Sequence, residues 1–305
     1  MTALTLGEGG TPLVRTPRIG ATLGCELWVK WEAANPTGSF KDRGMAVAVS
    51  RAVDAGARAV VCASTGNTAA SAAAYAARAG IDAVVLTPAG ATAGPKRAQA
   101  RAVGARVVEV DGTFDDALRL CRELATRDGF VLVNSVNPDR IEGQKSVVAE
   151  IVEALGAAPD VIALPFGGGG NVSAVVAGLD DAGASTRVVV GEAVERPTTW
   201  ASAIRISEPA HAENVARLVA AGRVEVVPLA EDELRRAWRT LAEEEGLFCE
   251  PASAAGVGAL AKAGGATGTV VCIATGHGLK DAGAVEEPPS RPVAASVEAV
   301  LEALA

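Results

Sequence analysis

Histidine is scarce in this sequence, and its cysteines form no metal-binding or disulfide pattern. There are two histidines and five cysteines, with no Cys-x-x-Cys pair. A histidine-rich metal centre is therefore not expected, and an odd number of scattered cysteines indicates free thiols in a reducing compartment. Any chemistry must then come from other side chains or from a bound cofactor. The cysteines are Cys25, Cys62, Cys121, Cys249 and Cys272.

Long apolar runs and an excess of positive charge are also absent. No stretch approaches the roughly 20 apolar residues that span a bilayer. Residues 1–10 lack the basic start and apolar middle of a signal peptide. The formal net charge of −8 argues against a nucleic acid or a membrane surface as the partner. We therefore expect a cytoplasmic protein that acts on a small molecule.

Short apolar runs alternate with helix-forming stretches along most of the 305 residues. Most of the runs are apolar throughout, which is typical of parallel strands covered by helices on both faces. Predicted strands cover residues 26–32, 59–63, 83–87, 105–111, 161–166, 186–192, 224–229 and 269–274. A proline-containing linker at 288–292 precedes a predicted closing helix at 297–304. The pattern predicts an α/β protein, and the length allows two domains.

Residues 35–44 read Asn-Pro-Thr-Gly-Ser-Phe-Lys-Asp-Arg-Gly, which predicts a turn that begins a helix. We expect Ser39 to cap this helix. Lys41 then lies in the first turn, where the helix dipole opposes a positive charge by roughly 0.3–1 kcal/mol. A lysine that loses its proton readily can form a Schiff base with a carbonyl compound. For an arbitrary lysine, an ordinary surface position after a turn is the more common case.

Four consecutive glycines, Gly167, Gly168, Gly169 and Gly170, stand between a predicted strand and a predicted helix and are followed by Asn171. Such a run loses much backbone entropy on folding, so it indicates a close approach of the backbone to a ligand. A glycine loop that leads into a helix N-terminus is suited to binding phosphate. A flexible loop is the alternative. The spacing does not continue as G-x-G-x-x-G, which disfavours a dinucleotide site.

Three further polar segments are candidates for ligand binding because they follow predicted strands or lie in the polar stretch that precedes residue 146. Residues 64–68, Ser-Thr-Gly-Asn-Thr, either cap a helix or offer donors to a carboxylate. Arg140 is a candidate for bidentate anion binding, although an isolated arginine is more often on the surface. Thr275 follows an apolar strand, at the sheet edge where open α/β sheets bind ligands.

Six segments in the same order resemble the motifs of threonine synthases, which are fold-type II enzymes that use pyridoxal 5′-phosphate (PLP). The resemblance covers nearly the whole chain and includes the lysine motif around Lys41 and the segment Asn-Ser-Val-Asn-Pro-x-Arg around Arg140. The six segments are residues 7–13, 35–44, 64–71, 134–145, 250–255 and 275–281.

The resemblance implies a role for each matching residue. Lys41 would carry PLP as a Schiff base, and Asn67 would bind the 3′-oxygen of the cofactor. Residues Gly167 to Asn171 would hold the PLP phosphate. Thr275 would face the pyridine nitrogen without enforcing its protonation. The substrate, O-phospho-L-homoserine, would be bound by Ser64, Thr65, Thr68, Asn134 and Arg140.

The resemblance also implies a two-domain fold with PLP in the cleft between two open parallel sheets. A small domain at residues 45–129 would be inserted into a large one made of residues 1–44 and 130–305, and the enzyme would be a cytoplasmic homodimer. The expected reaction converts O-phospho-L-homoserine and water into L-threonine and phosphate.

Two departures from the family pattern leave other substrates open. The family's phosphate loop usually reads Gly-Asn-Ala-Gly-Asn, whereas the all-glycine start in this chain resembles the serine/threonine dehydratases. We also expect residues to be missing around 192–201. A dehydratase, a specialised-metabolism enzyme that acts on another γ-substituent, and a non-catalytic PLP- or amino-acid-binding protein are the alternatives. The intact Lys41 disfavours the last of these.

Overall fold

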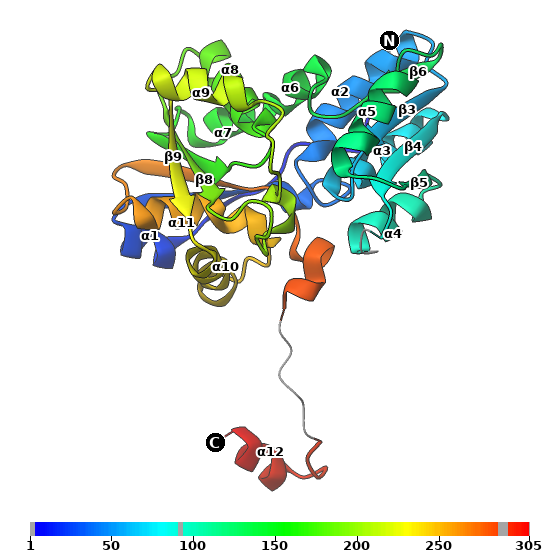
Figure 1. Cartoon of the computed structure of the whole chain (residues 1–305). Coiled ribbons are helices and arrows are strands. Elements are labelled where there is room, and N and C mark those ends of the chain that lie inside the picture. The colour runs from blue at the N-terminus through cyan, green and yellow to red at the C-terminus, as the bar shows by residue number, and fades with distance from the viewer. Residues whose placement is uncertain (1–3, 91–93, 286–291, 305) are drawn as a thin grey trace.

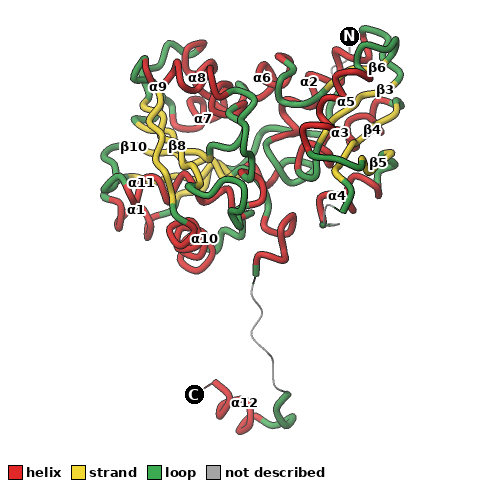
Figure 2. The backbone as a smooth tube through the Cα atoms, in the orientation of Figure 1, coloured by secondary structure: helices red, strands yellow, loops and turns green. Residues whose placement is uncertain are grey.

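The computed structural model describes residues 4–90, 94–285 and 292–304. Its strands form two sheets, which Figure 2 shows as two separate yellow groups surrounded by red helices. The larger sheet has six strands in the order β1-β2-β10-β7-β8-β9, and only the pairing of β1 with β2 is antiparallel. These strands are β1 (Leu13–Arg15), β2 (Glu26–Trp31), β7 (Val161–Pro165), β8 (Arg187–Ala193), β9 (Val224–Leu229) and β10 (Thr269–Ala274).

The second sheet has four strands in the order β5-β4-β3-β6, all of them parallel. Its strands are β3 (Ala59–Ala63), β4 (Asp82–Pro88), β5 (Arg106–Val110) and β6 (Phe130–Leu132). They follow one another in the chain between β2 and β7, so this sheet interrupts the larger one. Strand β6 lies just beyond residue 129, at which the sequence analysis ended the inserted domain.

Helices cover both sheets, as Figure 1 shows. The α-helices are α1 (Pro17–Leu23), α2 (Lys41–Asp54), α3 (Asn67–Ala79), α4 (Pro95–Ala102), α5 (Phe114–Leu124), α6 (Pro138–Gln144), α7 (Ser146–Leu155), α8 (Gly170–Asp181), α9 (Ala212–Ala220), α10 (Glu231–Glu245), α11 (Ala255–Lys262) and α12 (Val297–Leu304). Short 3₁₀ helices are η1 (Glu32–Ala34), η2 (Ser202–Ile204), η3 (Pro251–Ala254) and η4 (Gly278–Ala284). No helix of the described ranges is long and apolar enough to cross a membrane.

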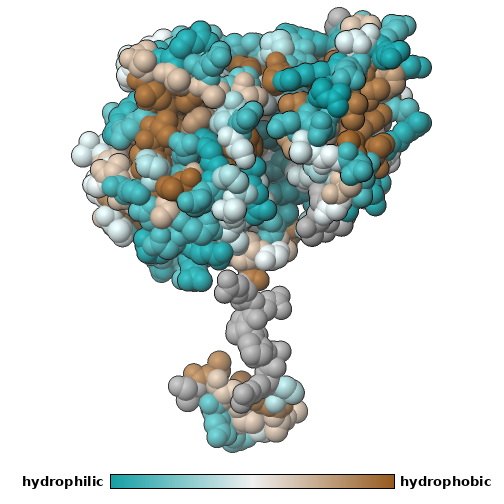
Figure 3. Space-filling view, in the orientation of Figure 1, coloured by the Kyte–Doolittle hydropathy of each residue, from teal (hydrophilic) through white to brown (hydrophobic). Residues whose placement is uncertain are grey.

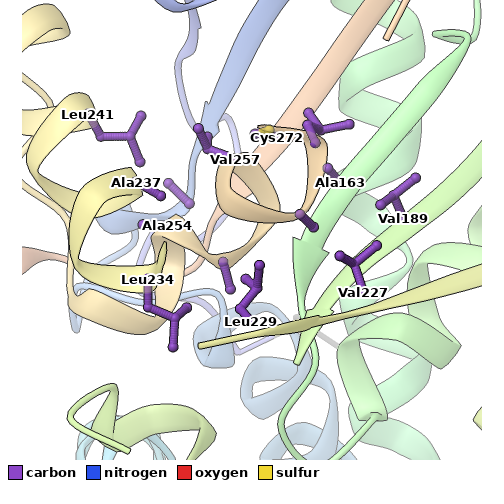
Figure 4. Close-up of a cluster of buried hydrophobic side chains, with 14 of the residues drawn as sticks. Ala163, Val189, Val227, Leu229, Leu234, Ala237, Leu241, Ala254, Val257 and Cys272 are labelled. Carbon is purple, nitrogen blue, oxygen red and sulfur yellow. The ribbon is translucent and has the colours of Figure 1, made fainter. Parts of the chain in front are cut away.

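The central strands of the larger sheet are buried on both faces, which explains why their sequences are apolar throughout. In β7, Ala163 packs with α10 and α11 on one face, whereas Ile162 and Leu164 pack with α7 and α8 on the other. Figure 4 shows the first of these clusters, in which Leu234 of α10 and Val257 of α11 face the strands. Since alternate strand residues point to opposite faces, this packing confirms the predicted covered parallel sheet.

Helix α12 differs from the others because none of its side chains is buried. Its bounds agree with the prediction, and the Ser296 hydroxyl accepts a hydrogen bond from the Ala299 N–H, as an N-cap residue does. Of the linker predicted at 288–292, only Pro292 belongs to the described residues. Figure 1 draws α12 apart from both sheets.

Candidate active site

The turn that carries Lys41 is joined to the end of β10 by backbone hydrogen bonds. The N–H of Phe40 donates to the carbonyl oxygen of Thr275 at 3.0 Å, and Ser39 pairs with Gly276 in an antiparallel bridge. The Thr275 hydroxyl lies 3.0 Å from the hydroxyl of Ser253. Lys41 and Thr275 therefore meet at the carboxyl edge of the larger sheet, where open α/β sheets bind ligands.

Helix α2 begins at Lys41, but Ser39 does not cap it, so that prediction was wrong. The N-cap position is Phe40, and the buried hydroxyl of Ser39 has no hydrogen-bond partner in the described part of the chain. The carboxylate of Asp42 stabilises the turn instead. It accepts hydrogen bonds from the N–H and the hydroxyl of Thr37, each at 2.6 Å, and from the hydroxyl of Ser71, also at 2.6 Å.

A buried ion-pair network holds the next residue, Arg43. Its guanidinium pairs with Glu32 at 2.6 Å and with Glu150 at 2.6 Å, and Lys30 pairs with Glu150 at 2.7 Å. Burial raises the pKa of Glu150, but the hydrogen bonds from Arg43 and Lys30 outweigh it and bring this pKa to about 2. Lys41 is thus followed directly by two anchored side chains, which restrict the position of its backbone.

The amine of Lys41 is easier to deprotonate than that of an ordinary lysine. Burial lowers its pKa to about 7, and the positive charge of Arg140 contributes to the decrease, whereas the negative charge of Glu250 opposes it. The nitrogen lies 4.4 Å from the centre of the Phe40 ring. At neutral pH a large fraction of the amine is therefore in the nucleophilic form.

Arg140 is completely buried in α6, behind Lys41. Its guanidinium donates to the carbonyl oxygen of Val133 at 2.9 Å and to that of Lys41 at 3.4 Å, while Nε finds no hydrogen-bond partner within the described ranges. Among the described residues, no carboxylate forms a salt bridge with it. Burial lowers the pKa of Arg140 to about 10, although Cys62 and Asp42 act in the opposite direction. A buried cation without an anionic partner is rare.

Asn67, at the first turn of α3, is held by Glu250. The Asn67 amide nitrogen lies 2.9 and 3.0 Å from the two carboxylate oxygens of Glu250, and its amide oxygen has no partner in residues 4–90, 94–285 and 292–304. Glu250 is itself buried and forms a 3.0 Å salt bridge with Lys96 of α4. Burial lowers the pKa of Lys96, but Glu250 and Asp281 outweigh it and leave this pKa raised.

The sequence analysis gave no role to Lys96, and it used Glu250 only as part of a motif. The two residues are far apart in the chain and belong to segments that pack on different sheets, so no local spacing reveals the pair. A buried lysine in the short basic helix α4 is also unexpected, since lysine is almost never fully buried unless paired.

The glycine loop lies between β7 and α8. The N–H groups of residues 167–170 donate to no acceptor within the described part of the chain. Gly169 has φ of +83°, and a Cβ there would lie 3.0 Å from Cβ of His211. His211 also fixes the loop, because its N–H donates to the Gly168 carbonyl at 3.0 Å and its ring contacts the Ser135 carbonyl at 2.9 Å. This is a helix N-terminus with free donors, as anion binding requires.

The other predicted substrate residues are occupied by local contacts or are exposed. The Ser64 hydroxyl accepts from the N–H groups of Gly66 at 3.0 Å and Ala69 at 3.2 Å, so it caps α3. The Asn134 amide forms two hydrogen bonds with the backbone of Ala63, next to Ser64. Thr65 is exposed and Thr68 half-buried, and neither hydroxyl has a partner among the described residues.

Besides the Ser39 hydroxyl, three buried polar atoms of the predicted site residues have no hydrogen-bond partner among the described residues. They are the amide oxygen of Asn67, Nε of Arg140 and the amide nitrogen of Asn171. Because buried polar atoms are nearly always paired, they indicate room for a polar ligand. With the free N–H groups of the glycine loop and the amine of Lys41, the site offers contacts for a phosphate, a ring oxygen and an aldehyde. These groups fit PLP.

The comparisons with known proteins agree with this chemistry. The model of the family "Pyridoxal-phosphate dependent enzyme" matches residues 4–276. Threonine synthase of Mycobacterium leprae is 47% identical over 328 residues, which cover 99% of this chain and 91% of that protein. The threonine synthase of Methanocaldococcus jannaschii is 40% identical over 95% of this chain and 80% of that protein.

The chain is therefore a pyridoxal-phosphate-dependent enzyme of the α/β type. More narrowly, it belongs to the threonine synthase family, as the resemblance of its motifs had indicated.

Solved structures confirm the fold. Maize serine racemase superposes with a TM-score of 0.77 at 23% identity and covers 88% of both chains. Threonine deaminase isoform 2 from Solanum lycopersicum superposes with a TM-score of 0.76 at 23% identity, over 88% of this chain and 79% of that one. At these identities the likeness concerns the fold, which is that of the fold-type II enzymes.

The aligned length of 328 residues exceeds the 305 residues of this chain, so the mycobacterial relative has residues that this chain lacks. The sequence analysis predicted such a loss around residues 192–201. There, Arg196 donates to the carbonyl oxygens of Gly167 and Ile206, each at 3.2 Å, and lies 4.5 Å from the centre of the Phe166 ring. Arg196 thus links this segment to the glycine loop.

Proposed function

We propose that this enzyme converts O-phospho-L-homoserine and water into L-threonine and phosphate. The family membership supports this reaction, and one observation carries it further. Arg140 is a buried cation beside Lys41 with no carboxylate partner among the described residues. The phosphate of the substrate carries about two negative charges, so it would supply the anion that the protein does not.

The chain's own residues would divide the work as follows. PLP supplies an electron sink that makes the substrate protons next to the bound carbon acidic. The Lys41 amine would take the proton from Cα and move protons at Cβ, because its lowered pKa lets it act as both base and acid near neutrality. Phosphate would leave from Cγ and water would add at Cβ.

Binding and orientation would fall to the surrounding loops. The N–H groups of residues 167–171 would hold the PLP phosphate, Asn67 its ring oxygen, and the hydroxyl of Thr275 would face the pyridine nitrogen. Arg140 and Asn134 would bind the substrate phosphate, and Ser64, Thr65 and Thr68 the neighbouring carboxylate. The side chains of Ser64 and Asn134 already form hydrogen bonds with the backbone. They would therefore either shape the site or break these hydrogen bonds when the substrate binds.

A dehydratase is the second candidate, and the glycine loop favours it. Gly167 to Gly170 depart from the usual synthase loop, and the segment that Arg196 links to them is where residues are expected to be missing. Both features would lie close to the cofactor phosphate if the glycine loop binds it. The changed loop and the shortened segment would affect which substrate is accepted. They would not affect the attachment of the cofactor, because Lys41 is retained.

One assay tests the proposal directly. The purified, PLP-loaded protein is given O-phospho-L-homoserine in one sample and L-threonine in another, and phosphate, threonine and 2-oxobutanoate are followed together. We expect phosphate and threonine in equal amounts with little 2-oxobutanoate. Formation of 2-oxobutanoate from threonine, without turnover of the phosphorylated substrate, would overturn the proposal in favour of the dehydratase.

We further propose that the two sheets belong to two domains with PLP in the cleft between them. The smaller domain corresponds to the predicted insertion at residues 45–129 and would include β6. The enzyme would act as a cytoplasmic homodimer. Sedimentation of the purified protein tests the subunit number.

A further inference from the structure

Helix α12 presents an apolar face that no other described residue buries. Val297, Val300, Leu301 and Leu304 follow the spacing of one helix face and are 70, 46, 61 and 78% exposed. Figure 3 shows brown, apolar surface on this C-terminal helix. A helix of eight residues is marginal in water by itself. Its sequence is nevertheless clearly helical, with Ser296 as a cap, so it needs a surface to pack against.

Helix α10 carries a hollow that such a face could fill. We call it the tryptophan groove. It has a volume of about 310 Å³ and is lined by Trp200, Trp238, Phe248, Arg235, Arg239 and Val285, among others. Trp200 and Trp238 are in edge contact with ring centres 5.2 Å apart, and Trp238 lies 6.2 Å from Phe248. The groove is therefore aromatic, and its floor is fixed by the hydrogen bond from Trp238 to the Cys249 carbonyl at 2.7 Å.

The charges of the two surfaces are complementary. Helix α12 carries Glu298 and Glu302 and no basic residue. On the groove, Arg239 is exposed and forms no salt bridge within the described ranges, while Arg235 lies 4.5 Å from the centre of the Trp200 ring. Arg235 pairs with Glu231 at 3.7 Å, and the acidic Glu243 also lines the groove, so the match favours a helix placed towards Arg239.

The chain itself brings the helix to this place. Val285 lines the groove, and eleven residues separate it from Val297. Such a connection reaches about 40 Å when extended, whereas α12 is only about 12 Å long. A tether of this length gives an effective concentration of about 1 mM. A groove that binds the free helix with a Kd of about 0.1 mM would then be occupied about nine-tenths of the time.

We propose that α12 docks in the tryptophan groove of its own chain, with the face formed by Val297, Val300, Leu301 and Leu304 against the aromatic rings. The groove is then an intramolecular docking site, and the C-terminal helix packs against α10.

Amide hydrogen exchange on the full-length, PLP-loaded protein tests this. Three proteins are compared: the unaltered chain, Leu301→Asp, and the matched control Ala299→Asp, which adds the same charge on the opposite face of the helix. In the unaltered chain and the control, we expect the amides of residues 297–304 to exchange about tenfold more slowly than in Leu301→Asp. Residues 235–243 should lose protection in Leu301→Asp as well.

A variant on the groove provides the second arm. Arg239→Glu replaces an exposed attraction for Glu298 and Glu302 by a repulsion, and it should speed the exchange of α12 without altering the rest of the exchange pattern. Rapid exchange of α12 in the unaltered chain would overturn the proposal, as would equal exchange in Leu301→Asp and Ala299→Asp. Protection that falls on about fifty-fold dilution would also overturn it, since it would assign the helix to the groove of a second copy.

Discussion

Both hydrogen bonds of the Asn67 amide nitrogen go to the carboxylate of Glu250, at 2.9 and 3.0 Å. Glu250 also forms a salt bridge with Lys96. Lys96 belongs to α4, which packs beside the four-stranded sheet, whereas Glu250 directly precedes η3, which packs beside the six-stranded sheet. The residue expected to bind the ring oxygen of PLP is therefore held by an ion pair that joins the two sheets. A cofactor that accepts a hydrogen bond from the Asn67 amide must therefore displace the Glu250 carboxylate from that amide or shift its position.

We predict that the salt bridge between Lys96 and Glu250 contributes to the free energy of unfolding, because it links the segments that pack on the two sheets. Lys96→Met leaves Glu250 buried without its cation, which typically costs about 3–5 kcal/mol. The double variant Lys96→Met/Glu250→Gln removes both charges and should regain part of this loss. Denaturant unfolding of the four proteins of this cycle measures the coupling. A single variant as stable as the unaltered protein would show that the pair is dispensable.

Lys41 should react with amine reagents at a much lower pH than other lysines. Its pKa of about 7 means that the neutral amine dominates above neutrality in the cofactor-free protein. Labelling by a neutral arylating reagent, resolved by peptide, should reach half its maximal rate near pH 7 at Lys41. The control is Lys262, which lies on the surface in a salt bridge with Glu233. Parallel profiles for the two lysines would contradict the lowered pKa.

The same lysine is predicted to carry the cofactor. Borohydride treatment of the purified enzyme should attach PLP covalently to the peptide that contains Lys41. In Lys41→Ala we expect no covalent attachment and no turnover, although PLP could still bind through the glycine loop. Attachment to Lys30 or Lys145 instead would refute the assignment, and peptide mass spectrometry distinguishes these positions.

Gly168 offers a clean test of the phosphate loop. A Cβ at this position would meet only the Ile206 side chain, at 3.6 Å, and the residue has no positive φ. Gly168→Ala should therefore fold normally but weaken the retention of PLP, because the methyl group lies beside the free N–H donors. Dialysis followed by absorbance measures the loss. Unchanged PLP affinity would show that the phosphate binds elsewhere.

Gly169→Val is less informative, and the structure explains why. Gly169 has φ of +83° and lies against His211 and Val215, so a valine there strains the backbone and displaces α9. This variant should lose thermal stability as well as PLP. The comparison of the two variants separates crowding of the ligand from damage to the loop.

The parts that sequence reasoning located are those with a local signal. Mainly apolar runs that alternate with helical stretches identified eight of the strands. The capping box that Thr113 and Asp116 form at α5 is likewise a local pattern. Strands β1 and β6, of three residues each, have too little pattern to be recognised. Helix α6 was not among the predicted elements, because its Asn-Pro start is equally typical of a turn.

The electrostatics of the site could not be read from spacing. Lys41 was identified from its turn, but its lowered pKa depends on burial and on Arg140, 99 residues further along the chain. Ser39 illustrates the opposite error, since a local rule predicted a cap where Asp42 and Ser71 took over through a contact between α2 and α3. Charges that meet only in the folded state leave no mark on the local sequence.

The choice between synthase and dehydratase depends on Arg140. Its guanidinium is buried, has no carboxylate partner among the described residues and retains an unpaired Nε. Threonine has no phosphate for it to bind, whereas O-phospho-L-homoserine does. Loss of a partner for a buried charge typically costs about 3–5 kcal/mol, which corresponds to about 10²- to 10⁴-fold in kcat/KM. Arg140→Ala should lower kcat/KM for the phosphorylated substrate by this factor.

Arg140 also donates to the carbonyl oxygens of Val133 and Lys41, so its removal could disturb the lysine itself. The control is internal: any side activity on serine or threonine is measured in the same variant, together with its melting temperature and its bound PLP. Arg140→Lys keeps the charge but loses the two-pronged geometry, and it should retain more activity on the phosphorylated substrate than Arg140→Ala. If both activities fall equally while PLP stays bound and the fold is intact, Arg140 serves to position Lys41. The phosphate must then be bound by other residues, and the synthase proposal would lose the observation that carries it.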